Sequence, residues 1–176
     1  MRHSEPRIVE GTPYYQWELT PAAPNYVKLA LKEMGTLLDR IEQVISSTET
    51  KAIRTAELVT KYTGIPNSSS ESFIEVSMRE AIVDAETFKA IRYQQLANPD
   101  HQHHQAETVT EAIKRFSQEL QQVPENALIV SHGTMLTTYL NSISPRPVNE
   151  LIEAWNSIRY CAWGYIQDGS VKRFLS

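Results

Sequence analysis

The sequence predicts an α/β protein, and two observations support this fold class. Short apolar runs alternate along the chain with turn-rich segments and with segments in which apolar residues recur at helical spacing. The chain has 176 residues, of which 41% are hydrophobic and 22% are charged. This length is enough for one well-buried core and too short for two comfortable domains. We therefore expect a single domain over residues 1–176.

The first half of the chain predicts a loop followed by alternating helices and strands. Residues 1–20 are irregular, and the proline of Thr20-Pro21 stands where a helix start tolerates it. Ser47 and Thr48 are candidate caps of the second helix, and Gly64-Ile65-Pro66 ends it. The predicted order is a loop over 1–20, a helix over 20–38, a strand over 43–46, a helix over 47–59 and a strand over 73–76.

The second half predicts two more helices before the clearest strand of the chain. That strand, residues 127–131, is almost wholly apolar, and a glycine leads from it into the next helix. An Asp-Gly turn near the end is typical of a hairpin. The predicted order is a helix over 86–96, a polar loop over 98–104, a helix over 106–123, a strand over 127–131, a helix over 135–141 and a hairpin of 158–166 with 171–175.

Composition and charge exclude several classes of partner. The formal net charge is -4, and no block of lysine and arginine concentrates positive charge, so we expect no nucleic-acid binding. No run of 18 apolar residues occurs, and the first residues are polar, so we expect no membrane span and no exported chain. Cys161 is the only cysteine and fits a small core residue in a strand. These features together favour a cytoplasmic protein.

Two histidine motifs stand at sites where phosphate chemistry is feasible. Arg2-His3 pairs an imidazole with a cation, and Ser131-His132-Gly133 follows the apolar strand directly. In open α/β folds, ligands bind at the carboxyl edge of the sheet, which is where His132 would lie. Each motif also has a structural interpretation. Arg2-His3 can be an exposed pair at a frayed end, and His132 can be a hydrogen-bonded residue at a helix start.

A third motif predicts an anion pocket at the start of the second helix. Ser46-Ser47 ends a strand, and Lys51 lies within about the first turn of the helix that follows. The amino end of a helix offers free N–H groups and partial positive charge, to which Lys51 adds a cation. Arg54 is one turn further along and is interpreted as a surface or structural cation.

These three motifs, in this order, resemble those of the histidine phosphatase superfamily, whose fold is phosphoglycerate-mutase-like. The family pattern is Arg-His-Gly, then Ser-Ser-x-x-x-Arg-Ala-x-x-Thr-Ala, then Ser-His-Gly. The resemblance implies a three-layer sandwich with a mostly parallel central sheet and helices on both faces. It places the proton-donating acid at Glu80 of Met78-Arg79-Glu80, with Glu5 and Glu107 as substitutes.

The chain departs from the family pattern at several positions. Lys51 stands where arginine is usual, so a point charge replaces a planar fork that binds two phosphate oxygens. Ser4 and Ala106 each replace a glycine. The family's first strand would need roughly five or six residues before Arg2, where the sequence has Met1 alone. A shortened start is the favoured account, and the alternative is a domain that folds without this strand.

The resemblance implies a metal-independent phosphomonoesterase that acts on a small phosphorylated substrate through a phosphohistidine. His3 would be the nucleophile, Glu80 the proton donor, and Arg2, Lys51 and His132 would hold the phosphate. No cofactor is implied. A phospholigand-binding or regulatory protein with little turnover is the main alternative, and a phosphomutase is less favoured because the chain has little room for extra lid segments. Residues 7–18 and 84–105 are the candidate lid, and neither substrate nor oligomeric state can be decoded from the sequence.

The histidines of the polar loop suggest a metal site only weakly. His101, His103 and His104 are close in sequence, but adjacent histidines need a sharply folded loop to converge on one ion. Asp100 alone is a poor fourth ligand. A solvated polar loop is the preferred interpretation, so no metal ligand is assigned.

Overall fold

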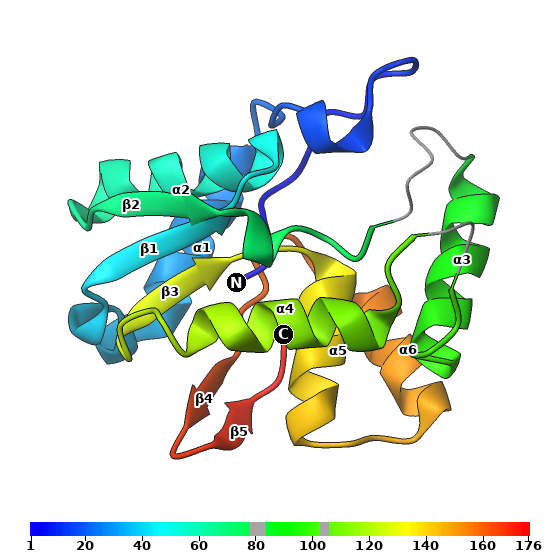
Figure 1. Cartoon of the computed structure of the whole chain (residues 1–176). Helices are drawn as coiled ribbons and strands as arrows, with labels where there is room; N and C mark the ends of the chain where they lie inside the picture. Colours follow the sequence, from blue (N-terminus) through cyan, green and yellow to red (C-terminus); the bar gives the residue numbers. More distant parts are fainter. Residues whose placement is uncertain (78–83, 103–105) are drawn as a thin grey trace.

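A parallel three-stranded sheet lies at the centre of the computed structural model, which describes residues 1–77, 84–102 and 106–176 (Figure 1). The strands are β1 (Gln43–Ser47), β2 (Asn67–Ser70) and β3 (Ala127–Val130), arranged in the order β2-β1-β3. Ile45 is in register with Ser68 of β2 and with Ile129 of β3. The α/β fold class is confirmed.

Helices cover both faces of this sheet, as predicted. One face packs against α1 (Ala23–Met34) and α2 (Thr50–Thr63), and the other against α4 (Val109–Leu120) and α5 (Gly133–Ile143). Successive strand residues point to opposite faces, so Val44 belongs to the first core and Ile45 to the second. Among the described residues, no helix combines the length and the apolar character needed to cross a membrane.

Two further helices lie side by side at one end of the molecule (Figure 1). They are α3 (Ala85–Ala97), which Asp84 caps, and α6 (Val148–Ser157), which also contacts α5. The sequence analysis did not predict α6, although Val148, Leu151 and Trp155 follow helical spacing after Pro147. Three short 3₁₀ helices, Tyr14–Gln16, Gly35–Arg40 and Glu71–Phe73, complete the helical segments of the described residues.

The predicted strand over 73–76 is wrong. The strand at this point is β2, whose four polar residues Asn67–Ser70 form the edge of the sheet, and Phe73 lies in the 3₁₀ helix that follows. An edge strand with an exposed face needs no apolar pattern, so its sequence gives little signal. Phe73 and Val76 are apolar because they are buried beneath α4 and α5.

The predicted strand over 158–166 is too long, whereas the hairpin itself is present. Only β4 (Tyr165–Gln167) is extended, and it pairs with β5 (Ser170–Arg173) in a separate antiparallel sheet. Cys161 has a φ of 57°, which interrupts the extended run, although its side chain is buried in the core as expected. The turn places both Asp168 and Gly169 at positive φ, the geometry that an Asp-Gly turn favours.

Residues 1–3 run alongside β3 rather than fraying. Arg2 pairs in parallel with Ser131, and the amide of His3 donates to the carbonyl oxygen of Ser131 at 2.9 Å. On the other side, the amide of Arg2 donates to the carbonyl oxygen of Ala162 at 2.9 Å. His3 is therefore held between β3 and the segment before β4. The expected apolar strand upstream of Arg2 stays a prediction.

Candidate active site

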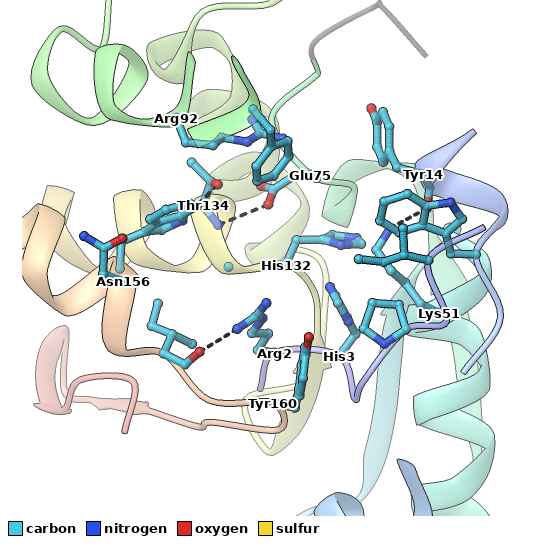
Figure 2. A pocket seen from close by; sticks show the side chains of 17 residues that line it. Arg2, His3, Tyr14, Lys51, Glu75, Arg92, His132, Thr134, Asn156 and Tyr160 are labelled. Atoms are coloured by element: carbon cyan, nitrogen blue, oxygen red, sulfur yellow. Dashed lines mark hydrogen bonds between the residues drawn. The ribbon is translucent and has the colours of Figure 1, made fainter. Parts of the chain in front are cut away.

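The predicted site residues Arg2, His3, Lys51 and His132 converge on one cavity of about 300 Å³ (Figure 2). It lies at the carboxyl ends of β1 and β3, where α2 and α5 begin. Parallel strands that pair in register end at the same edge of the sheet, so residues that follow them meet there. Other side chains that line the cavity include Tyr14, Trp17, Glu75, Phe88, Arg92, Thr134, Trp155, Asn156 and Tyr160.

The two histidine rings face each other across the floor of this cavity. Their centroids are 5.2 Å apart, and both residues are buried. The Nδ1 of His3 lies 2.7 Å from the carbonyl oxygen of Ser4. Because a carbonyl can only accept, this nitrogen carries the proton, which leaves the lone pair on Nε2. The fold thus fixes the tautomer that makes Nε2 of His3 nucleophilic.

His132 is anchored through its other ring nitrogen. Its Nε2 lies 2.8 Å from the hydroxyl oxygen of Ser47, the residue that ends β1. The same hydroxyl accepts the amide of Glu49 at 3.1 Å, which orients it toward the ring. The Nδ1 of His132 has no hydrogen-bond partner within the part of the chain that the structure describes. A buried polar atom of this kind is suited to a ligand.

Both imidazoles are held in the neutral form. Burial lowers the pKa of His3 well below 6.5, and the neighbouring His132, Lys51 and Arg2 lower it further. Burial and the Lys51 ammonium likewise lower the pKa of His132 well below 6.5, against an opposing effect of Glu75. The nucleophilic form of His3 therefore persists below the pH at which an ordinary histidine becomes protonated.

Arg2 contributes a guanidinium to the lining of the cavity. Its Nη1 donates to the carbonyl oxygen of Ile158 at 2.5 Å, and the guanidinium carbon stands 4.8 Å from the centre of the Tyr160 ring. Its Nε is buried and has no hydrogen-bond partner among the described residues. Arg2 is thus fixed in position with an N–H group left for an anion.

Lys51 reaches the cavity but is paired with a carboxylate. Its Nζ donates to the carbonyl oxygen of Tyr14 at 3.0 Å and forms a buried salt bridge with Glu49. The other carboxylate oxygen of Glu49 accepts the amide of Glu75 at 3.1 Å and lies 3.5 Å from Nε2 of His132. The sequence analysis did not single out Glu49, which the motif places between the serines and Lys51.

Among the described residues, the carboxylate that lines the cavity is not one of the predicted acids. Glu80 lies outside the described residues. Glu5 accepts a hydrogen bond from Thr20 and Glu107 forms an ion pair with Arg115, and neither is among the lining residues. Of the carboxylates in the described part of the chain, the one that lines the cavity is Glu75. A single acidic residue within the apolar run over 73–76 was the sequence signal for it.

Glu75 is held by the start of α5. Its carboxylate accepts the amide of Thr134 at 3.1 Å and the amide of Met135 at 2.8 Å. Burial alone would raise the pKa of the Glu75 carboxyl, but Arg92 and His132 outweigh that effect, and its pKa lies below the usual value. The resting carboxyl is therefore ionised.

Arg92 also lines the cavity, beside the predicted cations Arg2 and Lys51, and sequence reasoning missed it. It belongs to α3 and is buried with Ile91 and Leu96, on the face of the helix that packs against the rest of the protein. The signal that the sequence offered for Arg92 was a charged residue among the apolar positions of the predicted helix.

Two of the three histidines that suggested a metal site in the polar loop lie outside the described residues, so this hypothesis stays untested. The described residues contain no group of three or more His, Cys, Asp or Glu side chains arranged to hold an ion. His101 is exposed, whereas His103 and His104 lie outside the described residues.

Known structures share this fold over nearly the whole chain. A mycobacterial glucosyl-3-phosphoglycerate phosphatase is 13% identical, with a TM-score of 0.75 and coverage of 99% of this chain and 96% of that one. Bacillus stearothermophilus YhfR is 18% identical, with a TM-score of 0.74 and coverage of 99% and 93%. A phosphoserine phosphatase mutant from Entamoeba histolytica, in complex with phosphoserine, is 13% identical, with a TM-score of 0.70 and coverage of 99% and 94%.

The family comparison covers the greater part of the sequence. No curated protein matches this chain by sequence. The family model of the histidine phosphatase superfamily (branch 1) matches residues 18–166, a region that contains Lys51 and His132 and begins after His3. Because the match spans well over half of the chain, the protein belongs to the histidine phosphatase superfamily.

Proposed function

We propose that this protein hydrolyses a phosphate monoester through a phosphohistidine formed on His3. The observation that carries the proposal is the pairing of two buried, neutral imidazoles around one cavity with Nε of Arg2 and Nδ1 of His132, which have no partner among the described residues. Phosphoryl transfer needs an in-line nucleophile and positive groups around the equatorial oxygens. Membership in the superfamily and the phosphatases among the similar structures support the same reaction class.

In the first step, Nε2 of His3 attacks phosphorus, and the bond from phosphorus to the leaving oxygen breaks. Nδ1 keeps its proton and its hydrogen bond to Ser4, so the developing positive charge of the ring is stabilised. Nε of Arg2, Nδ1 of His132 and the ammonium of Lys51 face the phosphoryl oxygens. In the second step, water attacks phosphorus, the N–P bond breaks, and phosphate leaves with His3 neutral again.

Glu75 is proposed as the acid in the first step and the base in the second. It would give its proton to the leaving alkoxide and then take one from the attacking water. The resting carboxyl is ionised, so it must gain a proton when substrate binds. A phosphate dianion placed beside it raises the carboxyl pKa through like-charge repulsion, which favours that uptake. Glu80 remains the alternative acid suggested by the family pattern.

The test is the His3→Ala variant with 4-nitrophenyl phosphate as the substrate. We expect kcat/KM to fall by about 10³-fold or more, because the variant has no nucleophile. Rapid quenching of the unmodified protein with ³²P-labelled substrate should give a labelled protein whose label is labile in acid and stable in base. The His3→Ala variant should give none.

The matched control is His101→Ala, which removes an exposed histidine that does not line the cavity. Its turnover should equal that of the unmodified protein. Full turnover by the His3→Ala variant would show that His3 is not the nucleophile.

A phosphate-binding protein with little turnover is a second candidate, favoured by one observation. The Glu49 carboxylate compensates the charge of Lys51, which weakens the positive field available to a transition state. In this case, inorganic phosphate would bind to the protein, but rapid quenching would show no labelled intermediate with any phosphomonoester.

A further inference from the structure

Residues 74–77 form an irregular segment whose backbone is held by charged side chains. The segment carries Glu75, the proposed proton donor, and it belongs to neither a helix nor a strand. Backbone groups outside regular structure must find their partners elsewhere. One example is the carbonyl oxygen of Val76, which accepts from Nη1 of Arg92 at 2.9 Å. Two further residues, Arg115 and Glu107, hold the segment in the same way.

Arg115 of α4 holds the peptide group that precedes Glu75. Its Nη1 donates to the carbonyl oxygen of Ser72 at 2.6 Å, and Nη1 and Nη2 both donate to the carbonyl oxygen of Ile74 at 3.4 Å. That carbonyl and the amide N–H of Glu75 belong to one planar peptide group. The N–H donates to a carboxylate oxygen of Glu49 at 3.1 Å. Arg115 and Glu49 therefore fix both ends of the group from which the Glu75 side chain extends.

Glu107 fixes Arg115 and the other end of the segment. Its Oε1 accepts from Nη2 of Arg115 at 2.6 Å and its Oε2 accepts from Nε at 3.2 Å, which makes a bidentate pair. The same Oε1 accepts the amide of Ser77 at 3.0 Å. Every nitrogen of the Arg115 guanidinium thus donates a hydrogen bond. The two side chains are only 22% and 20% exposed, so water competes weakly with these contacts.

The backbone contacts matter most when Glu75 is protonated. The resting carboxylate is also held by the amides of Thr134 and Met135. A carboxyl that takes up a proton gains an O–H donor and loses part of its capacity to accept. The position of the working acid therefore depends more on its backbone. Neither Arg115 nor Glu107 lines the cavity, so a change at either leaves the groups around the phosphate in place.

We propose that Arg115 and Glu107 are positioning residues for proton transfer, because they fix the peptide group from which the Glu75 side chain extends. The inference rests on the proposed function, with Glu75 as its acid. A misplacement of about 1 Å can lower a rate by roughly a hundredfold, even when the change lies far from the reacting atoms. This loss should affect the reactions that need the proton.

The experiment compares two esters of similar shape, 4-nitrophenyl phosphate and 4-nitrobenzyl phosphate. 4-Nitrophenolate leaves as a stable anion, whereas the benzylic alkoxide must be protonated as it leaves. The value of kcat/KM covers the reaction up to the formation of the phosphohistidine, so the acid affects it mainly for the nitrobenzyl ester. We expect Arg115→Met to lower kcat/KM for the nitrobenzyl ester by about tenfold more than for the nitrophenyl ester.

Further variants separate positioning from stability. A damaged fold reduces the amount of active protein, which lowers kcat/KM for both esters equally and leaves their ratio unchanged. Glu107→Gln should shift the ratio in the same direction as Arg115→Met, and Arg115→Lys, which keeps a donor, should recover part of it. Glu75→Gln is the reference and should change the ratio most. The matched control is Lys114→Met, which removes an exposed cation from the same helix and should leave the ratio unchanged.

The contrary outcomes are distinguishable. Equal losses for both esters in Arg115→Met and Glu107→Gln would give the pair a structural role alone, and the positioning role is then wrong. If Arg115→Met does not fold, an unchanged ratio in Glu107→Gln and Arg115→Lys overturns the inference. An unchanged ratio in Glu75→Gln also overturns it, while the phosphohistidine reaction stands. If the unmodified protein hydrolyses neither ester, the proposed function fails, and the inference fails with it.

Discussion

The buried pair of Glu49 and Lys51 determines how much positive charge the cavity presents to an anion. Both side chains are about 6% exposed, so their interaction is poorly screened by water. A carboxylate oxygen of Glu49 also lies 3.5 Å from Nε2 of His132. The other ring nitrogen, Nδ1, is the one that has no partner among the described residues. An arginine at position 51 could serve a carboxylate and a phosphate at once through its five donors, whereas lysine divides one ammonium between its partners.

Glu49→Gln should therefore tighten phosphate binding. The change removes one negative charge near Lys51 while the amide oxygen can still accept from the Glu75 amide. We expect a gain of about 1.4 kcal/mol, which is roughly a tenfold lower inhibition constant for inorganic phosphate. Competitive inhibition of 4-nitrophenyl phosphate hydrolysis would measure it.

The control for this variant is Glu125→Gln, which removes the same charge from an exposed position. It should leave the inhibition constant unchanged. Equal or weaker phosphate binding by Glu49→Gln would mean that Glu49 serves to hold Lys51 in place.

The sequence was sufficient to find the candidate site residues that belong to motifs. It was insufficient for those whose place in the cavity depends only on how the chain folds. Arg2, His3, Lys51 and His132 follow recognisable patterns, and the structure brings them to one cavity. Glu75 and Arg92 stand in segments with no motif, and their importance depends on which neighbours the fold gives them. Long-range packing of this kind cannot be derived from local spacing.

At the scale of elements, α4 shows how local sequence defines a boundary. Thr108 accepts the amide of Glu111 at 3.1 Å, and the Glu111 carboxylate accepts the amide of Thr108 at 2.8 Å. This reciprocal capping box starts the helix at Val109, three residues after the predicted start at 106. Elements with such signals were located well, whereas the polar edge strand β2 and helix α6 were missed. Helix α6 begins after Pro147 with no side-chain cap.

Thr108→Ala should destabilise the protein by about 1 kcal/mol, because the amide of Glu111 loses its acceptor. The free energy of unfolding from a urea titration measures the change. Gln118→Ala, an exposed substitution within the same helix, is the control and should cost less than about 0.5 kcal/mol. An equal loss of unfolding free energy in both variants would contradict a stabilising role of the Thr108 cap.

For the whole molecule, the site joins segments that are distant in the sequence. His3 is held by Ser131, His132 by Ser47, and Glu75 by the start of α5. Each of these contacts joins segments that only the tertiary structure brings together. The buried histidines therefore couple the protonation of the site to the stability of the entire fold.

The free energy of unfolding should fall as the pH drops below 6.5. Both His3 and His132 have folded-state pKa values well below 6.5, so the unfolded chain binds more protons in this range. Each unit of pKa depression is about 1.4 kcal/mol of stability lost at low pH. Urea titrations followed by circular dichroism between pH 5 and pH 7.5 would measure the slope, above the range in which carboxylates titrate.

Variants measure how much of this pH dependence comes from the histidines of the cavity. His3→Ala should reduce the slope, and His101→Ala, at an exposed histidine, should leave it unchanged. A stability that is flat from pH 7.5 to pH 5 would contradict the buried neutral state of the two imidazoles.

The positions of the tryptophan side chains allow ligand binding to be followed by the intrinsic fluorescence of the protein. The chain has three tryptophans, and two of them, Trp17 and Trp155, line the cavity while Trp163 lies in the core. Indole emission depends on the polarity around the ring, so a ligand that enters the cavity should change the emission of Trp17 and Trp155. Occupancy of the cavity can therefore be followed by light emission without any added label.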